Sequence, residues 1–379
     1  MIIKREIQSQ AEDALFKGKI IVIYGPRQVG KTTLAKLILQ NQQRIKSAYF
    51  NCDEPDICRS LTDKTSTELK LLLGDNKLVV LDEAQRVKNI GLTLKLLVDN
   101  YPGTQIIATG SSSFDLSNQI FEPLTGRKKE FYLYPFSLSE LKNSYSEIEL
   151  NRTLGNRMVF GMYPGVVFES DKGKAESLRE LAKSYVYKDA LEYQGIKNSE
   201  IVEKLLQALA LQMGNEVSYN ELASLIEVNK ITVANYIQIL EKAFIIFRLP
   251  SFSRNLRDEI KSNRKIYFFD NGIRNALINN LNPIDLRQDA GALWENFMIS
   301  ERVKRNINSG RGANLYFWRT LQRQEIDLIE DYQGELAGFE FKWKSRPGKV
   351  PVAFSRAYPN AKVQMITQDN YQNFTGRRQ

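Results

Sequence analysis

One short stretch constrains the fold of this 379-residue chain more than any other. Residues 25–32 read GPRQVGKT, follow an apolar run at 20–24 and precede a helical pattern at 33–41. They fit the phosphate-binding pattern G-x-x-x-x-G-K-[ST] in the strand, loop and helix context that it requires. A glycine-rich turn that happens to contain Lys-Thr is the alternative, but it leaves the full spacing and both flanks unexplained.

The loop predicts a nucleotide site with specific contacts. Its backbone N–H groups would point at phosphate oxygens, and the following helix N-terminus adds partial positive charge. Lys31 would reach the β- and γ-phosphates and Thr32 would ligate Mg²⁺. We therefore expect ATP and Mg²⁺ as cofactors. The predicted nucleotide-binding residues are Gly25, Pro26, Arg27, Gln28, Val29, Gly30, Lys31, Thr32 and Thr33.

The composition is that of a globular protein with several domains. It is 42% hydrophobic and 26% charged, and its length suits two or three domains. No apolar run approaches the roughly 18 residues that span a bilayer, and the N-terminus lacks a signal-peptide core. We expect a cytoplasmic protein without a membrane partner.

The chain contains no histidine, and Cys52 and Cys58 are its only cysteines. Two thiols without histidine cannot complete a four-ligand zinc site, and catalysis by Ser-His-Asp or Cys-His groups is excluded. Any chemistry must therefore use carboxylates, lysine, arginine and hard metal ions.

Residues 1–140 alternate between apolar strands and helices, which predicts a parallel sheet covered by helices. The expected strands lie at 20–24, 48–51, 78–81, 105–109 and 130–134, and the expected helices at 33–41, 66–73 and 92–98.

Acidic and hydroxyl side chains follow two of these strands. Asp82 and Glu83 come after the third strand, where P-loop ATPases place one carboxylate for Mg²⁺ and a second that orients the attacking water. The fourth strand ends at Thr109, followed by Ser111, and either hydroxyl could sense the γ-phosphate. A solvated turn and a small-residue strand end are the alternatives. Glu83 favours a hydrolase over a phosphotransferase that acts on a small substrate.

Arg127 follows in the sequence LTGR and is a candidate arginine finger across a homo-oligomer interface. A fixed guanidinium charge suits the transition state of phosphoryl transfer. An ordinary surface arginine is the alternative.

Several motifs together resemble a known family: GPRQVGKTTLAK, LVVLDEAQRV, IIATGSSS, LTGRKKEFYLYPFSLSEL and YFFDNGIR. The chain is similar to predicted archaeal and bacterial ATPases of the AAA superfamily that carry a fused C-terminal domain of unknown function. The resemblance implies a P-loop ATPase core, a helix-turn-helix middle and a restriction-endonuclease-like C-terminal domain. It implies no known substrate.

The middle of the chain is predicted as a helical lid at 141–198 and a winged helix at 199–262. The helix at 231–242 would turn Ile231, Ala234, Ile237 and Leu240 inward and Thr232, Asn235, Gln238 and Lys242 outward. Such a polar stripe can enter the major groove of DNA, where Asn and Gln pair with adenine. A solvated or protein-binding face is the alternative.

Residues 263–379 form the last predicted domain, an α/β domain like that of restriction endonucleases. Alternation along one strand puts Glu340 and Lys342 on one face, and Asp327 on the neighbouring strand could share it. Carboxylates bind Mg²⁺, and the lysine can position water for attack on a phosphodiester. This looks like the PD-(D/E)XK nuclease core, with Glu295 matching the acid of its first helix, although no proline precedes Asp327. A hairpin with alternating exposed charges is the alternative.

The net charge of +9 is concentrated near the C-terminus, where residues 251–379 hold 21 Lys and Arg against 14 Asp and Glu. This excess suggests a polyanionic partner, and we expect DNA. On charge alone, a solvated basic surface is the alternative. The leading hypothesis is an ATPase that acts on DNA, with a Mg²⁺-dependent nuclease site. The second is an ATP-driven switch or adaptor whose nuclease-like domain only binds protein or nucleic acid.

Overall fold

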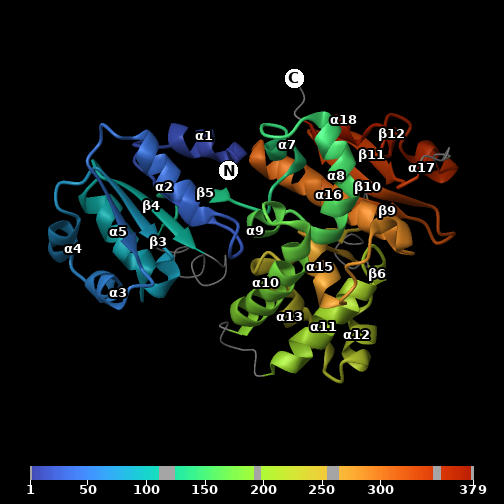
Figure 1. Ribbon diagram of the computed structural model, residues 1–379, viewed down its shortest axis with the longest axis horizontal. Coiled ribbons are helices and arrows are strands. Elements are labelled where there is room, and N and C mark those ends of the chain that lie inside the picture. The colour runs from blue at the N-terminus through green and yellow to red at the C-terminus, as the bar shows by residue number, and fades with distance from the viewer. Residues whose placement is uncertain (1, 111–123, 192–197, 254–263, 345–350, 377–379) are drawn as a thin grey trace. The chain divides into compact units, whose positions relative to one another are not determined.

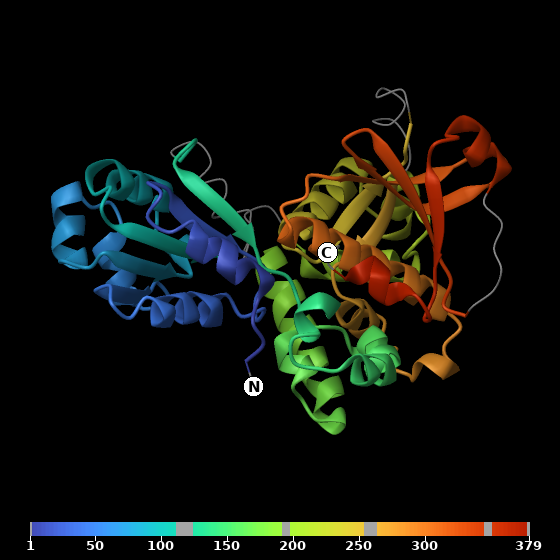
Figure 2. The same ribbon diagram turned by 90° about the horizontal axis from the view of Figure 1, so that it is seen from above.

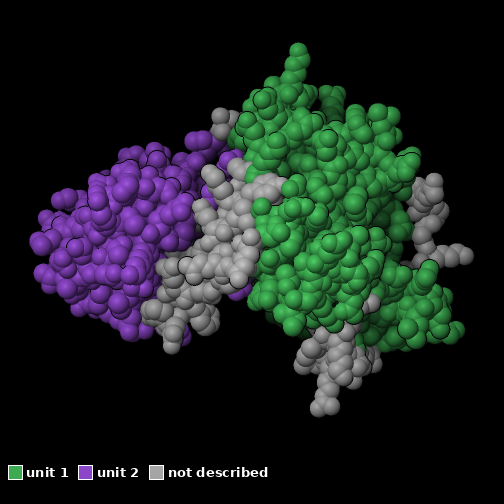
Figure 3. Space-filling model, turned by 90° about the horizontal axis from the view of Figure 1, so that it is seen from below, with its two compact units in different colours: residues 1, 135–241, 245–379 green, residues 2–134, 242–244 purple. Residues whose placement is uncertain are grey.

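The computed structural model describes residues 2–110, 124–191, 198–253, 264–344 and 351–376. The chain divides into two compact units (Figure 3). Unit 2 contains residues 2–134 and 242–244, and unit 1 contains the remainder of the chain. Among the described residues, none of the helices combines the length and apolar character needed to cross a membrane.

Unit 2 contains a five-stranded parallel sheet in the order β2-β3-β4-β1-β5 (Figure 1). Every residue of β1 and of β3 is buried, as expected for parallel strands covered on both faces. The order places β4 between the strand that leads into the P-loop and the strand that ends in Asp82. The strands are β1 (Ile20–Tyr24), β2 (Ser47–Asn51), β3 (Leu78–Asp82), β4 (Gln105–Gly110) and β5 (Lys128–Tyr132).

Helices connect these strands, as parallel strands require. They are α1 (Glu6–Asp13), α2 (Lys31–Asn41), α3 (Pro55–Leu61), α4 (Ser66–Leu73), the 3₁₀ helix η1 (Ala84–Arg86) and α5 (Ile90–Asn100). Thr65 begins α4 with a reciprocal capping box to Glu68, which satisfies two backbone donors of the first turn. This is the sheet and helix arrangement of P-loop NTPases, and the predicted fold class is confirmed.

Unit 1 begins with helices. They are α7 (Leu138–Leu141), α8 (Glu147–Phe160), α9 (Pro164–Val167), α10 (Asp171–Leu191), α11 (Ser199–Leu211), α12 (Tyr219–Leu225) and α13 (Lys230–Lys242). The predicted helical lid at 141–198 contains α8, α9 and α10, and its placement over the nucleotide stays a prediction.

A three-stranded sheet in the order β6-β8-β7 follows these helices. Its strands are β6 (Glu216–Val217), β7 (Ile246–Pro250) and β8 (Arg264–Phe268). Strands β7 and β8 pair in antiparallel register from Ile246 with Phe268 to Pro250 with Arg264. The structure therefore differs from the predicted boundary between residues 262 and 263, because that boundary separates two strands of one sheet.

The predicted inner face of α13 needs a correction. Ile231 was expected inside but is 72% exposed, whereas Val233, Ile237 and Leu240 are fully buried. A spacing of three residues turns only about 300° on a helix, so a stripe built on it drifts away from the core. The buried residues instead follow the i, i+4, i+7 pattern, while Asn235 and Gln238 are exposed as expected.

The last part of unit 1 is a four-stranded sheet in the order β12-β11-β10-β9. Strands β9, β10 and β11 are antiparallel, and β12 pairs with β11 in parallel. Figures 1 and 2 show the long helix α16 lying against this sheet. The strands are β9 (Asn314–Arg319), β10 (Glu325–Tyr332), β11 (Glu335–Phe341) and β12 (Lys362–Ile366). The helices are α15 (Asn271–Leu277), η2 (Ile284–Leu286), α16 (Ala290–Asn308), α17 (Val352–Ala357) and α18 (Tyr371–Thr375).

Candidate functional site

The P-loop lies between β1 and α2 and is closed by backbone contacts that only glycine permits. A Cβ on Gly25 would lie 2.1 Å from the carbonyl oxygen of Leu133, and Gly30 has a φ of +96°. The ammonium of Lys31 is buried inside the loop and donates to the carbonyl oxygens of Gly25 (3.0 Å) and Pro26 (2.9 Å). The loop is thus curled around the cation that the motif assigns to the phosphates.

Asp82 is the centre of a hydrogen-bonded cluster at the carboxyl end of the sheet. Thr32 Oγ1 donates to its Oδ2 at 2.6 Å, and Thr109 Oγ1 donates to its Oδ1. The structure therefore brings together the predicted hydroxyl of the P-loop, the predicted metal carboxylate and the predicted sensor. Hydroxyl and carboxylate oxygens are hard donors, so Thr32 and Asp82 fit a Mg²⁺ ion.

Glu83 is held beside this cluster. It adopts a left-handed φ of 52°, its N–H donates to Thr109 Oγ1 at 3.1 Å, and Gln85 Nε2 donates to its Oε2 at 2.5 Å. Strands β3 and β4 are neighbours, which explains how residues 26 positions apart meet here. The second predicted sensor, Ser111, lies outside the described residues.

Sequence reasoning missed two residues of the nucleotide site. Tyr49 on β2 donates its hydroxyl to Asp82 Oδ2 at 2.6 Å. The buried Arg5 donates to the carbonyl oxygens of Val29 (2.8 Å) and Tyr134 (2.5 Å), so it joins the P-loop to the segment after β5. Neither residue belongs to a local motif, because the hydrogen-bond partners of both lie far away along the chain.

Arg127 forms an ion pair on the surface of its own unit. Its Nε lies 2.7 Å from Asp99 Oδ1, and the two side chains are 42% and 38% exposed. The role of Arg127 as a finger for a second copy of the chain stays a prediction.

A second cluster lies in unit 1 and contains the predicted acids and lysine of the C-terminal domain. Lys342 Nζ lies 3.0 Å from Glu340 Oε2 and 3.9 Å from Asp327 Oδ2. The N–H of Phe341 donates to Asp327 Oδ2 at 2.8 Å, which holds this carboxylate against β11. Strands β10 and β11 are adjacent, so the predicted sharing of one region by Asp327, Glu340 and Lys342 agrees with the observed contacts.

Glu295 reaches the cluster from the first half of α16. Its Oε1 accepts from Tyr267 at 2.6 Å and from Lys265 at 3.2 Å. Lys265 is 2% exposed and also pairs with Glu325. Sequence reasoning missed Lys265 and Tyr267, because their contacts with Glu295 depend on the packing of β8 against α16 and not on a local pattern.

Burial and the repulsion between neighbouring carboxylates raise the pKa values of these acids. Burial, followed by the charge of Asp327, raises the pKa of Glu295 to about 7, although Lys265 and Tyr267 oppose this shift. Burial and the charge of Asp327 also raise the pKa of Glu340 to about 7 against the influence of Lys342. Burial raises the pKa of Asp327 above its ordinary value despite Lys265 and Lys342. Clustered carboxyl groups with raised pKa values are a frequent property of functional sites.

The fit of a metal ion can be tested on the donor atoms. Oε1 of Glu340 is buried and has no hydrogen-bond partner among the described residues. Within those residues, no group of three or more Cys, Asp or Glu side chains is close enough to hold a metal ion. Mg²⁺ commonly uses one or two carboxylates and takes its other ligands from water and substrate phosphates. Asp327 and Glu340 fit that requirement, and metal binding by Glu295 stays a prediction.

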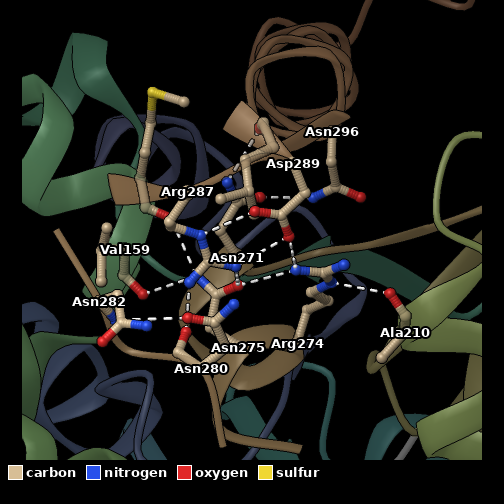
Figure 4. Close-up of polar contacts among 12 residues, drawn as sticks. Val159, Ala210, Asn271, Arg274, Asn275, Asn280, Asn282, Arg287, Asp289 and Asn296 are labelled. Atoms are coloured by element: carbon tan, nitrogen blue, oxygen red, sulfur yellow. Dashed lines mark hydrogen bonds and ion pairs between the residues drawn. The ribbon is translucent and has the colours of Figure 1, made fainter. Parts of the chain in front are cut away.

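A buried polar network surrounds the sequence DNGIR at 270–274 (Figure 4). Asp289 accepts from Arg287 Nε (2.8 Å) and from Arg274 Nη1 (2.5 Å), and Asn275 accepts from both arginines. Asn275 also donates to Val159 O, and Arg274 donates to Ala210 O. The network therefore joins α8, α11 and α15 to the start of α16, which gives this motif a structural role.

Comparisons with known proteins divide the chain into three parts. Residues 17–142 match a family model described as an AAA domain. Residues 151–283 and 290–377 match two models described as domains of unknown function (DUF8612 and DUF4143). The first match supports an AAA-type ATPase domain. The models of the other two parts carry no description of a nuclease.

Two curated relatives are similar over most of the chain. An uncharacterised protein of Mycobacterium tuberculosis is 25% identical over 350 residues, which are 92% of this chain and 75% of the relative. An uncharacterised protein of Methanocaldococcus jannaschii is 28% identical over 314 residues, which are 73% of this chain and 65% of the relative.

Solved structures with weaker similarity include one protein in complex with DNA and one bound to AMPPCP. Orc1 of Aeropyrum pernix in complex with DNA is 14% identical, with 74% of this chain and 93% of that chain covered and a TM-score of 0.31. AMPPCP-bound DnaA of Aquifex aeolicus is 16% identical, with 64% and 89% covered and a TM-score of 0.30. Because these TM-scores are below 0.5, the fold assignment depends on the strand order and the P-loop described above.

Proposed function

We propose that this protein hydrolyses ATP in unit 2 and cleaves DNA in unit 1. The proposed cleavage site is the cluster of Asp327, Glu340, Lys342 and Glu295, called the acid cluster below. The observation that carries the proposal is the meeting of Asp327 on β10, Glu340 on β11 and Lys342 directly after β11. One oxygen of Glu340 is buried and has no hydrogen-bond partner among the described residues. The AAA-domain match at residues 17–142 supports the ATPase part.

In the nucleotide site, the chain supplies contacts and orientation. Lys31 would exchange its two carbonyl partners for phosphate oxygens, which accept charge-assisted hydrogen bonds. Thr32 and Asp82 would hold Mg²⁺, which neutralises developing phosphate charge when bound. Glu83 would accept a proton from the attacking water, and Thr109 holds Asp82 and the backbone of Glu83 in register.

In the acid cluster, Asp327 and Glu340 would hold Mg²⁺, which polarises a phosphodiester and a bound water when present. Lys342 is 45% exposed, so its ammonium can reach a phosphate or a water outside the protein. The charges of Asp327 and Glu340 raise its pKa despite partial burial, which keeps it cationic. Lys265 and Tyr267 hold Glu295 in place.

A winged helix at α11–α13 with the β6-β8-β7 sheet would present DNA to the cluster. Asn235 and Gln238 are exposed on α13, as major-groove contacts require. The basic excess of residues 251–379 would add affinity for phosphates that depends on salt. Salt-dependent DNA binding that is unchanged in Asn235→Ala and Gln238→Ala would remove this role from α13.

A cleavage assay tests the proposal. Supercoiled plasmid and single-stranded DNA are incubated with Mg²⁺ or Mn²⁺, with and without ATP. We expect cleavage by the wild type and none by Asp327→Asn, while ATP hydrolysis continues in that variant. Asp331→Asn, on the same strand and outside the cluster, is the matched control and should cleave normally. Lys31→Ala then reports whether ATP hydrolysis is required for cleavage.

The second candidate function is an ATP-driven switch whose acid cluster holds protein or nucleic acid without cleaving it. The salt bridges of Lys342 and Lys265 favour it, because they neutralise part of the acidic charge without a metal ion. This function becomes the better account if the wild type cleaves no substrate above the background of Asp327→Asn under any condition.

A further inference from the structure

A separate pocket lies where the C-terminal end of α16 meets β10, β11 and β12. Its volume of about 740 Å³ is within the range of pockets that hold small ligands. Glu295 and Arg305 are ten residues apart on α16, so the pocket lies about 15 Å along the helix from the acid cluster. Its charged lining residues are Arg302, Arg305, Arg311, Lys362, Glu330 and Glu335.

Glu330 is the buried acid of this pocket, and its acceptor capacity is used up. It accepts from Arg302 Nε and Nη2 and from Asn306 Nδ2, and Arg311 Nη2 lies 3.2 Å from its Oε1. Burial alone would raise the pKa of Glu330, but these partners hold it below its ordinary value. A carboxylate offers about four lone-pair sites. It therefore has no site left for a further donor.

Arg311 has one N–H group that forms no hydrogen bond with Glu330. Its Nε is buried and has no hydrogen-bond partner among the described residues. Its guanidinium lies 4.0 Å from the centroid of the Tyr332 ring, which fixes the orientation of the planar group. A buried N–H without an acceptor is rare in proteins. The side chain as a whole is 25% exposed and lines the pocket, so an oxyanion there would meet the remainder of the guanidinium.

The charge of the lining specifies the anion. Four cationic side chains face two carboxylates, which leaves an excess of two positive charges. A phosphate monoester carries about −1.5 to −2 at neutral pH and offers three acceptor oxygens. Guanidinium groups bind such oxygens with paired, charge-assisted hydrogen bonds. The exposed Lys362 on β12 adds a point charge at the rim.

We propose that this pocket binds a phosphate monoester, carried by a free nucleotide or by the end of a nucleic-acid strand. Both sources present the same dianionic group to Arg311 and Lys362. Arg302 does not contact the ligand, since Glu330 and the rings of Phe339 and Phe374 enclose its guanidinium. The proposal is independent of DNA cleavage, because none of these residues belongs to the acid cluster.

Binding to full-length protein tests the proposal. The Lys31→Ala background weakens phosphate binding at the P-loop, and EDTA prevents cleavage. Calorimetric titrations compare AMP with adenosine, and anisotropy compares a short oligothymidylate with and without a 5′-phosphate. We expect the phosphate to strengthen binding by about tenfold or more in at least one pair. A preference in the AMP pair identifies a free nucleotide, and a preference only in the oligonucleotide pair identifies a strand end.

Added in that background, Arg311→Gln and Lys362→Gln should each remove most of this preference. Arg356→Gln makes the same change of charge on the exposed surface of α17, outside the pocket, and should retain it. Lys362 is exposed, so its variant should fold even if Arg311→Gln does not. Equal binding with and without phosphate in both pairs, or a preference that persists in Arg311→Gln and Lys362→Gln, overturns the proposal.

Discussion

Tyr49 shares one oxygen of Asp82 with the hydroxyl of Thr32, at 2.6 Å from each. A carboxylate that must contact the water shell of Mg²⁺ needs a fixed orientation, and Tyr49 supplies one of its three hydrogen bonds. Tyr49→Phe removes only that hydroxyl. We expect the Mg²⁺ concentration for half-maximal ATP hydrolysis to rise about tenfold, because a hydrogen bond to a charged group contributes about 1.5 kcal/mol.

The control for this prediction is Tyr101→Phe, which also removes a partly buried tyrosine hydrogen bond in unit 2, from Tyr101 to Ser66 O. It should leave the Mg²⁺ requirement unchanged. ATP hydrolysis rates across a Mg²⁺ titration measure both variants. If Tyr49→Phe has the Mg²⁺ requirement of the wild type, Tyr49 does not position Asp82.

The residues of the candidate nucleotide site could be located from the sequence because its parts are local motifs, and their roles stay predictions. Lys31, Thr32 and the pair Asp82-Glu83 each occupy a fixed place relative to a strand end. Arg5 and Tyr49 could not be found in this way, since their partners lie 24 to 129 positions away along the chain. Lys265 was missed for the same physical reason, because its partners Glu295 and Glu325 lie on α16 and β10, far along the chain.

At the scale of elements, α15 and α16 are joined by two arginines and one carboxylate. The side chain of Arg287 is 0% exposed and that of Arg274 4% exposed, and both pair with Asp289. Asp289→Asn leaves two buried guanidinium groups without a counter-charge. Breaking such a pair costs about 3 kcal/mol, so we expect unit 1 to lose about this much stability near neutral pH.

The pH dependence of this loss gives a sharper measurement. Burial would raise the pKa of Asp289, but the hydrogen bonds of Arg287 and Arg274 hold it below the ordinary value. A lowered pKa in the folded state contributes stability above the unfolded value of about 3.9, and this contribution is lost as the pH falls through the folded value. The difference in unfolding free energy between wild type and Asp289→Asn should therefore shrink below about pH 4.

Chemical denaturation monitored from pH 7 downwards measures this difference. Asp285→Asn, on the exposed side of η2, is the matched control and should match the wild type at every pH. A difference for Asp289→Asn that stays constant down to pH 3 would contradict the charge-pair explanation and indicate a loss of packing alone.

Element types were predicted better than element boundaries and faces. Strong alternation identified β10 and β11, and the apolar runs identified β1, β3 and β4. The face of α13 was misplaced because Ile231 lies in the first helical turn, beside solvent, although it is apolar. The predicted boundary at residue 262 followed a polar stretch, but pairing of β7 with β8 outweighs local composition.

At the scale of the whole molecule, the chain forms two compact units although four segments were predicted. The helical segment, the three-stranded sheet and the four-stranded sheet belong to one unit because buried polar groups connect them. Glu301 on α16 accepts from the N–H of Leu138, and Lys304 donates to Phe136 O. Such contacts between residues more than 160 positions apart cannot be read from local patterns.

Arg127 makes a prediction about assembly. Its ion pair with Asp99 is exposed, and such pairs contribute at most about 1 kcal/mol. The guanidinium can therefore leave Asp99 at little cost and reach a phosphate bound to a second copy of the chain. Arg127→Ala should lower the kcat of ATP hydrolysis by about 10³ with little change in ATP affinity. Arg86→Ala removes a similar exposed pair with Asp53 in the same unit and should retain the kcat.

Mixing two impaired variants separates action between copies from action within one copy. Lys31→Ala lacks a working P-loop but carries Arg127, whereas Arg127→Ala has the opposite defect. If the finger acts between copies, the mixture contains sites with an intact P-loop and an intact finger, and hydrolysis should rise well above that of either variant alone. If the finger acts within one copy, the mixture should show only the average of the two rates. Unchanged hydrolysis by Arg127→Ala itself would exclude both arrangements.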